Sequence, residues 1–471
     1  MIHNVLAEFY TDIFSDKRLD KRANIFLTDM IEKGSSIINQ CYGFHAERQA
    51  AYRLLNNEKC SLASLSAALY RDCRNSVVAS SHLLCIQDTT EFNYTAHIKG
   101  IGYDDEDLGP GGCDSNAVYF CHPTLVLDAA SEQPLGFSCV DLWNRSWDKS
   151  NKLERKYRQL PIEEKESNRW LTSIEQSKSN LATETIKTFI SDRESDIYQL
   201  FTLCDSRNLL LIRSTGLKRT DEGMNIKSQV QQWEVKHKFE LEVRGTRKRK
   251  KRTALLKLSF GKIQMLRPQR IKGNSYPSQI EVNCAYVKES AETTPAGEDP
   301  IEWLLLTTHS VHDIASALQC VLWYRLRWYI EELFRILKLQ GFNLEASQLE
   351  SGLALKRLLL FTLRAALQTM ILKIAYDKEE ENQSLTLAFS KKEIALLNIL
   401  LPSLEGKTQK QKNPFKQQTM AWSAWIIAKL GAWNGYKTQS PPGYITFKRG
   451  LDNFGKKMEL FNIIEKNVCK E

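Results

Sequence analysis

The first ninety residues change from a helical to a strand-like pattern of apolar positions. Residues 1–60 show the spacing of short helices; one is predicted to end at Gly34, and a second covers HAERQAAYRLLNN and ends near Asn56. In residues 77–95 the pattern becomes a continuous apolar run, HLLCIQ, and Asp88 follows it directly. A carboxylate at the end of a buried strand is a frequent place for a catalytic ligand, although, taken alone, Asp88 is better explained as the start of a turn.

The middle of the chain is predominantly strand-like. Residues 100–150 predict an antiparallel β-meander with turns at Asp128 and Gly136, whereas residues 151–187 are charged and helical, with Trp170 as a core anchor. Two apolar runs that resemble strands, IKTFI and LFTLC, precede Asp192 and Asp205. Further on, LLKLSFGKIQML and IEVNCAYVKE alternate like strands.

The last third is predicted to be helical. WYRLRWYIEELFRILKLQ contains no Gly or Pro and predicts one continuous helix. LALKRLLLFTLRAALQTMILKIAY predicts a long amphipathic helix that belongs to the core. After a basic loop, GKTQKQKNPFK, three tryptophans are typical of a core or an interface: Trp422, Trp425 and Trp433. Strands in the middle and helices at both ends predict an α/β protein, a mixed sheet flanked by helices.

One predicted helix carries an unusual set of polar side chains. At about 100° per residue, Tyr324, Arg327, Glu331 and Lys338 fall within a sector of roughly 60°. A carboxylate between phosphate-binding cations suits metal-assisted chemistry on a phosphodiester. The alternative is a solvated face with ion pairs one turn apart.

Length, charge and cysteine content narrow the class of protein. A chain of 471 residues suggests about three domains, and a net charge of +9 favours an anionic partner. We find no apolar run of about 18 residues and no secretory signal, so no membrane partner is expected. The 11 cysteines form no CxxC pair, which is typical of reduced thiols in a cytoplasmic protein.

Basic residues gather in three places. Arg18 and Arg22 lie on the first predicted helix, and the segment RSTGLKR contains Arg213, Lys218 and Arg219. A third cluster has seven Lys or Arg among residues 244–252, including Arg247, Lys248 and Arg249. Each is either a solvated surface or a phosphate-binding one, and candidate nuclease carboxylates favour DNA.

The spacing of Tyr324, Arg327, Glu331 and Lys338 resembles the signature of bacterial insertion-sequence transposases of the cut-and-paste DDE class. IQDTT and DRESDIY resemble the motifs around the first and second catalytic Asp of that family, and AAYRLLNN resembles part of its N-terminal end-binding domain. Asp196 and Asp205 compete with Asp192. Asp192 is favoured by its motif and because Arg213 stands where a DNA-contacting Arg is expected; Asp196 is placed to support it.

The resemblance implies an RNase H-like catalytic domain at residues 63–375 with a β-strand insertion at about 212–300. It also implies a helical domain at 1–62 that binds transposon ends and a helical dimerisation domain at 376–471. Asp88, Asp192 and Glu331 would hold Mg²⁺, with Mn²⁺ as a substitute. The expected partners are the element's terminal inverted repeats, target DNA and a second copy of the chain, in a bacterial, nucleoid-associated setting.

The same resemblance assigns roles to other side chains. Arg327 and Lys338 would clamp phosphates, Tyr324 would contact the phosphate of a displaced nucleotide, and Trp303 would stack on its base. Nicking, hairpin formation, hairpin opening and strand transfer would follow in that order. In one departure from relatives, Thr215 stands where a Lys is expected, so Lys218 or Arg219 would have to replace that contact.

Two other classes stay open at this point. An RNase H-type nuclease would use the same carboxylates, but hydrolysis alone does not call for the Trp303 platform. A catalytically inactive DNA-binding relative is disfavoured because all three carboxylates are present.

Overall fold

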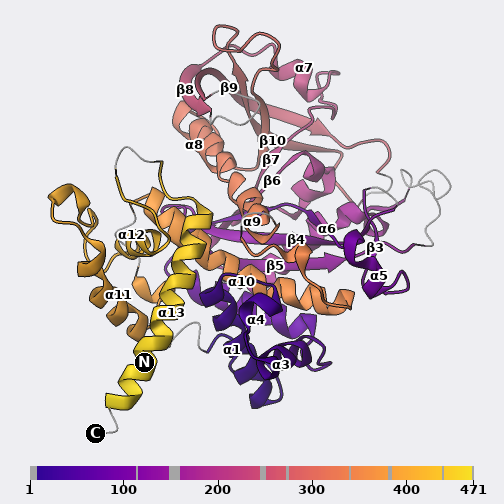
Figure 1. Ribbon diagram of the computed structural model, residues 1–471. Coiled ribbons are helices and arrows are strands. Elements are labelled where there is room, and N and C mark those ends of the chain that lie inside the picture. Colours follow the sequence, from indigo (N-terminus) through magenta and orange to yellow (C-terminus); the bar gives the residue numbers. More distant parts are fainter. Residues whose placement is uncertain are drawn as a thin grey trace. The chain divides into compact units, whose positions relative to one another are not determined.

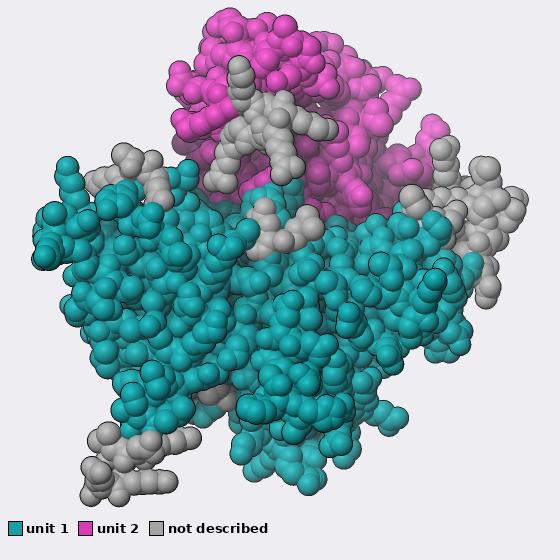
Figure 2. All heavy atoms as spheres, in the orientation of Figure 1, with its two compact units in different colours: residues 1–79, 89–149, 329–471 teal, residues 80–88, 150–328 magenta. Residues whose placement is uncertain are grey.

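The computed structural model describes residues 8–112, 115–147, 160–243, 251–271, 275–338, 341–379, 384–436 and 440–468. The chain forms two compact units (Figure 2). Unit 1 comprises residues 1–79, 89–149 and 329–471, and unit 2 comprises residues 80–88 and 150–328.

Unit 2 is built on a mixed sheet (Figure 1). β1 (His82–Gln87), β6 (Ile186–Ser191) and β7 (Asn208–Arg213) are parallel neighbours. The sheet continues antiparallel through β11 (Glu302–Thr307), β10 (Gln279–Glu289), β9 (Arg252–Leu266) and β8 (His237–Val243). The strands predicted from HLLCIQ, IKTFI and the two alternating runs are confirmed.

The helices of unit 2 are α6 (Arg169–Asn180), α7 (Ile226–Val230) and α8 (Ile314–Arg325), and α8 packs on β6, β7, β10 and β11. Short 3₁₀ turns are η3 (Ile162–Glu164), η4 (Glu166–Asn168), η5 (Arg193–Ser195) and η6 (Tyr198–Leu203). Trp170 is buried, as predicted. The strand predicted at LFTLC is wrong, because this run belongs to η6; periodicity alone does not distinguish such short apolar segments.

The N-terminal helices of unit 1 follow the sequence pattern closely. They are α1 (Lys17–Lys33), α2 (Ile38–Cys41), α3 (His45–Leu55) and α4 (Leu62–Ser76). Gly34 ends α1 in the left-handed region, at φ 56°, and donates its N–H to the carbonyl of Ile31. Asn56 caps α3, so both predicted helix ends are confirmed.

The strands of unit 1 are β2 (Thr90–Asn93), β3 (Gly109–Pro110), β4 (Ala117–Asp128) and β5 (Pro134–Trp143), joined through η1 (Thr95–His97) and α5 (Ile98–Ile101). The turn predicted at Asp128 is confirmed, since β4 and β5 form an antiparallel hairpin there. The turn predicted at Gly136 is wrong. Gly136 lies inside β5 at φ 148°, where a Cβ would come within 2.7 Å of the Cβ of Cys73.

The C-terminal part of unit 1 contains α9 (Trp328–Lys338), η7 (Leu344–Ala346), α10 (Gly352–Asp377), η8 (Leu385–Leu387), α11 (Lys391–Leu404), η9 (Gln409–Gln411), α12 (Met420–Leu430) and α13 (Tyr444–Val468). α10 is long and apolar enough to cross a membrane, but 94% of its most apolar window is buried inside the protein. It packs against α1, α4, α12 and α13. The predicted core role of α10 is therefore confirmed, whereas its predicted amphipathic character is wrong, because the helix is buried on all sides. Trp422 and Trp425 are core residues of α12.

The single helix predicted over residues 323–340 is also wrong, because α8 ends at Arg325 and α9 begins at Trp328. At the break, the N–H of Leu326 bonds to the carbonyl of Trp323, and the N–H of Arg327 bonds to the carbonyl of Tyr324. These three-residue steps tighten the end of α8. A common face calculated at 100° per residue does not extend across such a break.

Candidate active site

Three polar residues lie at the carboxyl ends of the parallel strands of unit 2. Ile86 of β1 pairs with Ile190 of β6, so Asp88 and Asp192, each two residues later, reach the same level of the sheet. Ser191 pairs with Ile212 of β7, which brings Arg213 to that level as well. Adjacent strands are about 4.8 Å apart, and this edge of a sheet is a common ligand site.

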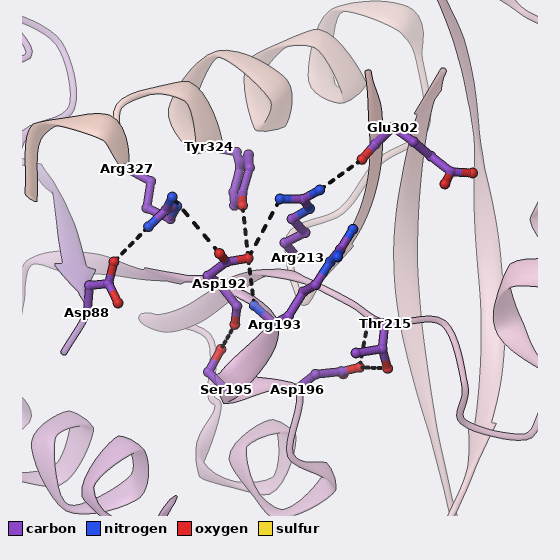
Figure 3. Close-up of polar contacts among 10 residues, drawn as sticks. All are labelled: Asp88, Asp192, Arg193, Ser195, Asp196, Arg213, Thr215, Glu302, Tyr324 and Arg327. Atoms are coloured by element: carbon purple, nitrogen blue, oxygen red, sulfur yellow. Dashed lines mark hydrogen bonds and ion pairs between the residues drawn. The ribbon is translucent and has the colours of Figure 1, made fainter. Parts of the chain in front are cut away.

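Arg327 links the two aspartates (Figure 3). Its Nη1 donates to Oδ2 of Asp88 at 2.8 Å, and its Nη2 lies 4.0 Å from Oδ2 of Asp192. Nη1 of Arg213 lies 3.9 Å from Oδ1 of Asp192. The Arg327 side chain is only 14% exposed, so water screens these charges less than at an open surface. Sequence analysis did not find the contact with Asp88, because 239 residues separate the partners.

Two aromatic side chains border Asp192. The hydroxyl of Tyr324 lies 3.5 Å from Oδ1 of Asp192, at the long limit of a hydrogen bond. Burial raises the pKa of Tyr324 to about 12, and the nearby Asp192 adds to the effect, so the phenol stays protonated. The ring of half-buried Trp303 on β11 is 6.0 Å from that of Tyr324 at 62°. Trp328, at 44% exposure, is not a core residue.

A tight turn orients Asp192. It is the N-cap of η5, and its side chain accepts a hydrogen bond from the N–H of Arg193 at 2.7 Å. Its carbonyl accepts the Ser195 N–H at 3.0 Å and the Ser195 hydroxyl at 2.7 Å. The same turn ends at Asp196, whose carboxylate points to the loop after β7 and forms an ion pair with Lys218.

Asp205 lies at the other end of the strands. It precedes β7, accepts hydrogen bonds from the N–H groups of Arg207 at 2.8 Å and Asn208 at 2.9 Å, and is 53% exposed. It therefore caps a turn at the amino end of a strand that runs parallel to β6. Of the acids considered, Asp192 is the one that shares Arg327 with Asp88.

Glu331 and Lys338 belong to unit 1, in the first and last turns of α9. A helix N-terminus favours a carboxylate such as Glu331, and a C-terminus favours a cation such as Lys338. Nζ of Lys338 lies 4.0 Å from Oε1 of Glu345 and 5.2 Å from the centre of the Phe92 ring. Burial lowers the pKa of Lys338, and the neighbouring carboxylates oppose this shift.

The other predicted DNA contacts differ in exposure. Lys218 is 11% exposed and paired with Asp196, whereas Arg219 is exposed and donates to the carbonyl of Gly223 at 2.8 Å. Arg18 is 92% exposed, and Arg22 is half-buried on α1.

Arg247, Lys248 and Arg249 lie outside the described residues. The roles of all these basic side chains in DNA binding stay predictions.

The donor set at this edge fits a hard divalent cation. Asp88 and Asp192 come from adjacent strands and share one guanidinium, so they are placed to share one cation. Carboxylate oxygens are the ligands of Mg²⁺ and Mn²⁺. Within each unit, the described residues bring together no group of three His, Cys, Asp or Glu side chains suited to a metal. Unit 2 itself therefore provides two carboxylates.

Comparison with known families agrees with this geometry. Residues 5–60 match the model described as transposase DNA-binding, and residues 152–367 match the transposase DDE domain. The first match covers α1 to α3, and the second includes Asp192, Arg213 and the segment from Tyr324 to Lys338. DDE domains are RNase H-like and generally use divalent metals, which fits the mixed sheet and the paired carboxylates. With its DNA-binding segment and its DDE domain, the chain belongs to the insertion-sequence DDE transposases, enzymes that act on DNA.

Proposed function

We propose that this transposase excises its element through hairpin ends and inserts it into target DNA, as a member of the subgroup with the Tyr-Arg-Glu-Lys signature. The observation that carries the proposal is the pairing of Asp88 and Asp192 through Arg327, beside Tyr324. Anionic ligands, a guanidinium and a neutral phenol at one sheet edge suit the binding of a phosphodiester.

Asp88 and Asp192, with Glu331 as the third carboxylate, are proposed to hold Mg²⁺ or Mn²⁺. Bound divalent ions would supply activation of the attacking oxygen and stabilisation of the leaving oxygen. Glu331 is assigned as a metal ligand from the sequence motif alone, in which it follows Arg327 by four residues.

The remaining side chains would bind and orient the DNA. Arg327 and Arg213 present two guanidinium groups near Asp192, and a guanidinium binds phosphate in bidentate fashion. The protonated phenol of Tyr324 would donate to a phosphate oxygen. Trp303, next to Tyr324, would stack on a base displaced from the duplex, with a contribution of about 1–3 kcal/mol. Lys338 would contact a further phosphate.

Four displacements at phosphorus make up the proposed reaction. Water first breaks a phosphodiester at the element's terminal inverted repeat and frees a 3′-hydroxyl. That hydroxyl attacks the opposite strand and forms a hairpin, which water then opens. The regenerated 3′-hydroxyl finally attacks target DNA, and each step exchanges one phosphodiester bond or hydrolyses it. A DNA-bound dimer would hold the two ends together.

The test is cleavage of labelled DNA that carries the element's own end, with Mg²⁺ or Mn²⁺, by the wild type, Asp192→Asn and Asp205→Asn. We expect hairpins and double-strand breaks with the wild type and Asp205→Asn, and bound but uncut DNA with Asp192→Asn. Asp205 is the matched control because it caps a turn at the other end of the strands. Nicks without hairpins would support a nuclease instead, and uncut DNA with the wild type would support a binding-only relative.

A further inference from the structure

A buried carboxylate next to the candidate site connects two loops. The Asp196 side chain is 3% exposed. Its Oδ2 accepts three hydrogen bonds, from the Ser214 hydroxyl at 2.8 Å and from the N–H and hydroxyl of Thr215 at 3.0 Å each. Its Oδ1 faces the Lys218 ammonium, which also donates to the Asp196 carbonyl at 2.7 Å (Figure 3 shows Asp196 and Thr215).

These bonds join the turn after β6 to the loop after β7. The turn begins at Asp192 and ends at Asp196, and the loop begins directly after Arg213. The N–H of Ser214 bonds to the carbonyl of Leu304 at 2.7 Å, so β11 also anchors the loop. The contacts of Asp196 therefore restrain the two segments that carry Asp192 and Arg213.

Charge explains why Lys218 belongs to this arrangement. A buried carboxylate is costly unless it is paired and hydrogen-bonded, and Lys218 supplies the opposite charge. Burial lowers the pKa of Lys218, while Asp196 acts in the other direction. An ammonium that is 11% exposed and already paired is poorly placed to contact a phosphate. Thr215 provides two of the donors to Asp196.

We propose that Asp196 is a positioning residue that, through Thr215 and Lys218, fixes the placement of Asp192 and Arg213. The inference rests on the proposed function, in which Asp192 holds a metal ion. Asp196 does not reach the reacting atoms. It acts through the loop, and its loss changes the metal requirement of cleavage.

The experiment measures single-turnover cleavage of end DNA across Mn²⁺ concentrations, together with DNA affinity and thermal stability. Asp196→Asn keeps an oxygen acceptor but removes the charge that faces Lys218. We expect cleavage to fall about 10–100-fold, the half-saturating Mn²⁺ concentration to rise, and excess Mn²⁺ to recover part of the rate. Asp205→Asn, the matched control, should behave like the wild type.

A second pair of variants keeps the test decisive if Asp196→Asn does not fold. Thr215→Val removes one hydroxyl donor and leaves the ion pair intact, and Thr215→Ser restores the hydroxyl. Thr215→Val should raise the Mn²⁺ requirement by less than Asp196→Asn does, and Thr215→Ser should have the Mn²⁺ requirement of the wild type.

Wild-type rates and Mn²⁺ dependence in both Asp196→Asn and Thr215→Val would overturn the inference. A rate loss that follows the folded fraction, with an unchanged Mn²⁺ requirement, would also overturn it, since the role would then be only structural. Asp192→Asn separates the two hypotheses. If that variant cleaves DNA, the proposed function fails; if it is inactive while Asp196→Asn is normal, only the present inference fails.

Discussion

A half-buried histidine pair in unit 2 is expected to make the stability of that unit depend on pH. Nε2 of His82 and Nε2 of His309 each lie 2.7 Å from the hydroxyl oxygen of Thr188. The Trp323 ring packs against both imidazoles, with ring centres 4.8 and 5.0 Å apart. The Thr188 hydroxyl has one proton, so at most one imidazole accepts a hydrogen bond from it. Protonation of both rings leaves neither imidazole able to accept a hydrogen bond and places two positive charges side by side.

The size of the effect follows from the pKa of His309. Burial lowers this pKa from 6.5 to about 4, and the nearby His82 contributes in the same direction. Since a tenfold change in proton affinity corresponds to about 1.4 kcal/mol, the difference amounts to about 3 kcal/mol. The folded-state pKa is below the unfolded one, so this stability is present above pH 6.5 and is lost as the pH falls toward 4.

The assay is urea unfolding of the wild type and His309→Gln at pH values between about 7 and 4.5. Gln places an amide near the position of Nε2 but does not titrate. As the pH falls from about 7 to 4.5, the free energy of unfolding of the wild type should decrease by about 2–3 kcal/mol more than that of the variant. His312→Gln is the control, because the His312 side chain is 74% exposed. Parallel pH profiles for the wild type and His309→Gln would refute the reasoning.

Three further predictions concern the site and the core. Arg327→Met should lower cleavage at least about 100-fold, because it removes the guanidinium shared by Asp88 and Asp192; wild-type rates on end DNA would contradict this role. Trp303→Ala should lower the yield of hairpin DNA about 10–100-fold, whereas Trp303→Phe should keep most of the wild-type yield. Equal hairpin yields for the two variants in a time course would exclude a stacking role. Phe361→Ala should cost about 3–5 kcal/mol in urea unfolding, because the fully buried ring packs on Tyr10 and Phe26; a loss below about 1 kcal/mol would contradict its core role.

Local patterns in the sequence determined much of the fold. The end of α1 at Gly34, the β1 strand and the alternating strands β9 and β10 follow from capping and periodicity, which depend on near neighbours in the chain. The family resemblance likewise depends on short motifs, and the matches to the transposase DNA-binding and DDE models agree with it.

Tertiary packing decided what local patterns leave open. The break between α8 and α9 occurs without Gly or Pro. Gly136 lies inside a strand, at a position where Cys73 leaves no room for a side chain. The periodicity of the sequence does not distinguish Asp192, Asp196 and Asp205, although the motif favours Asp192. Because β1, β6 and β7 are parallel, Asp192 reaches the level of Asp88 and Asp205 lies at the other end of the strands. Asp196 is buried against the loop after β7. Such neighbours are far apart in the chain, so only the folded sheet decides which carboxylate faces which cation.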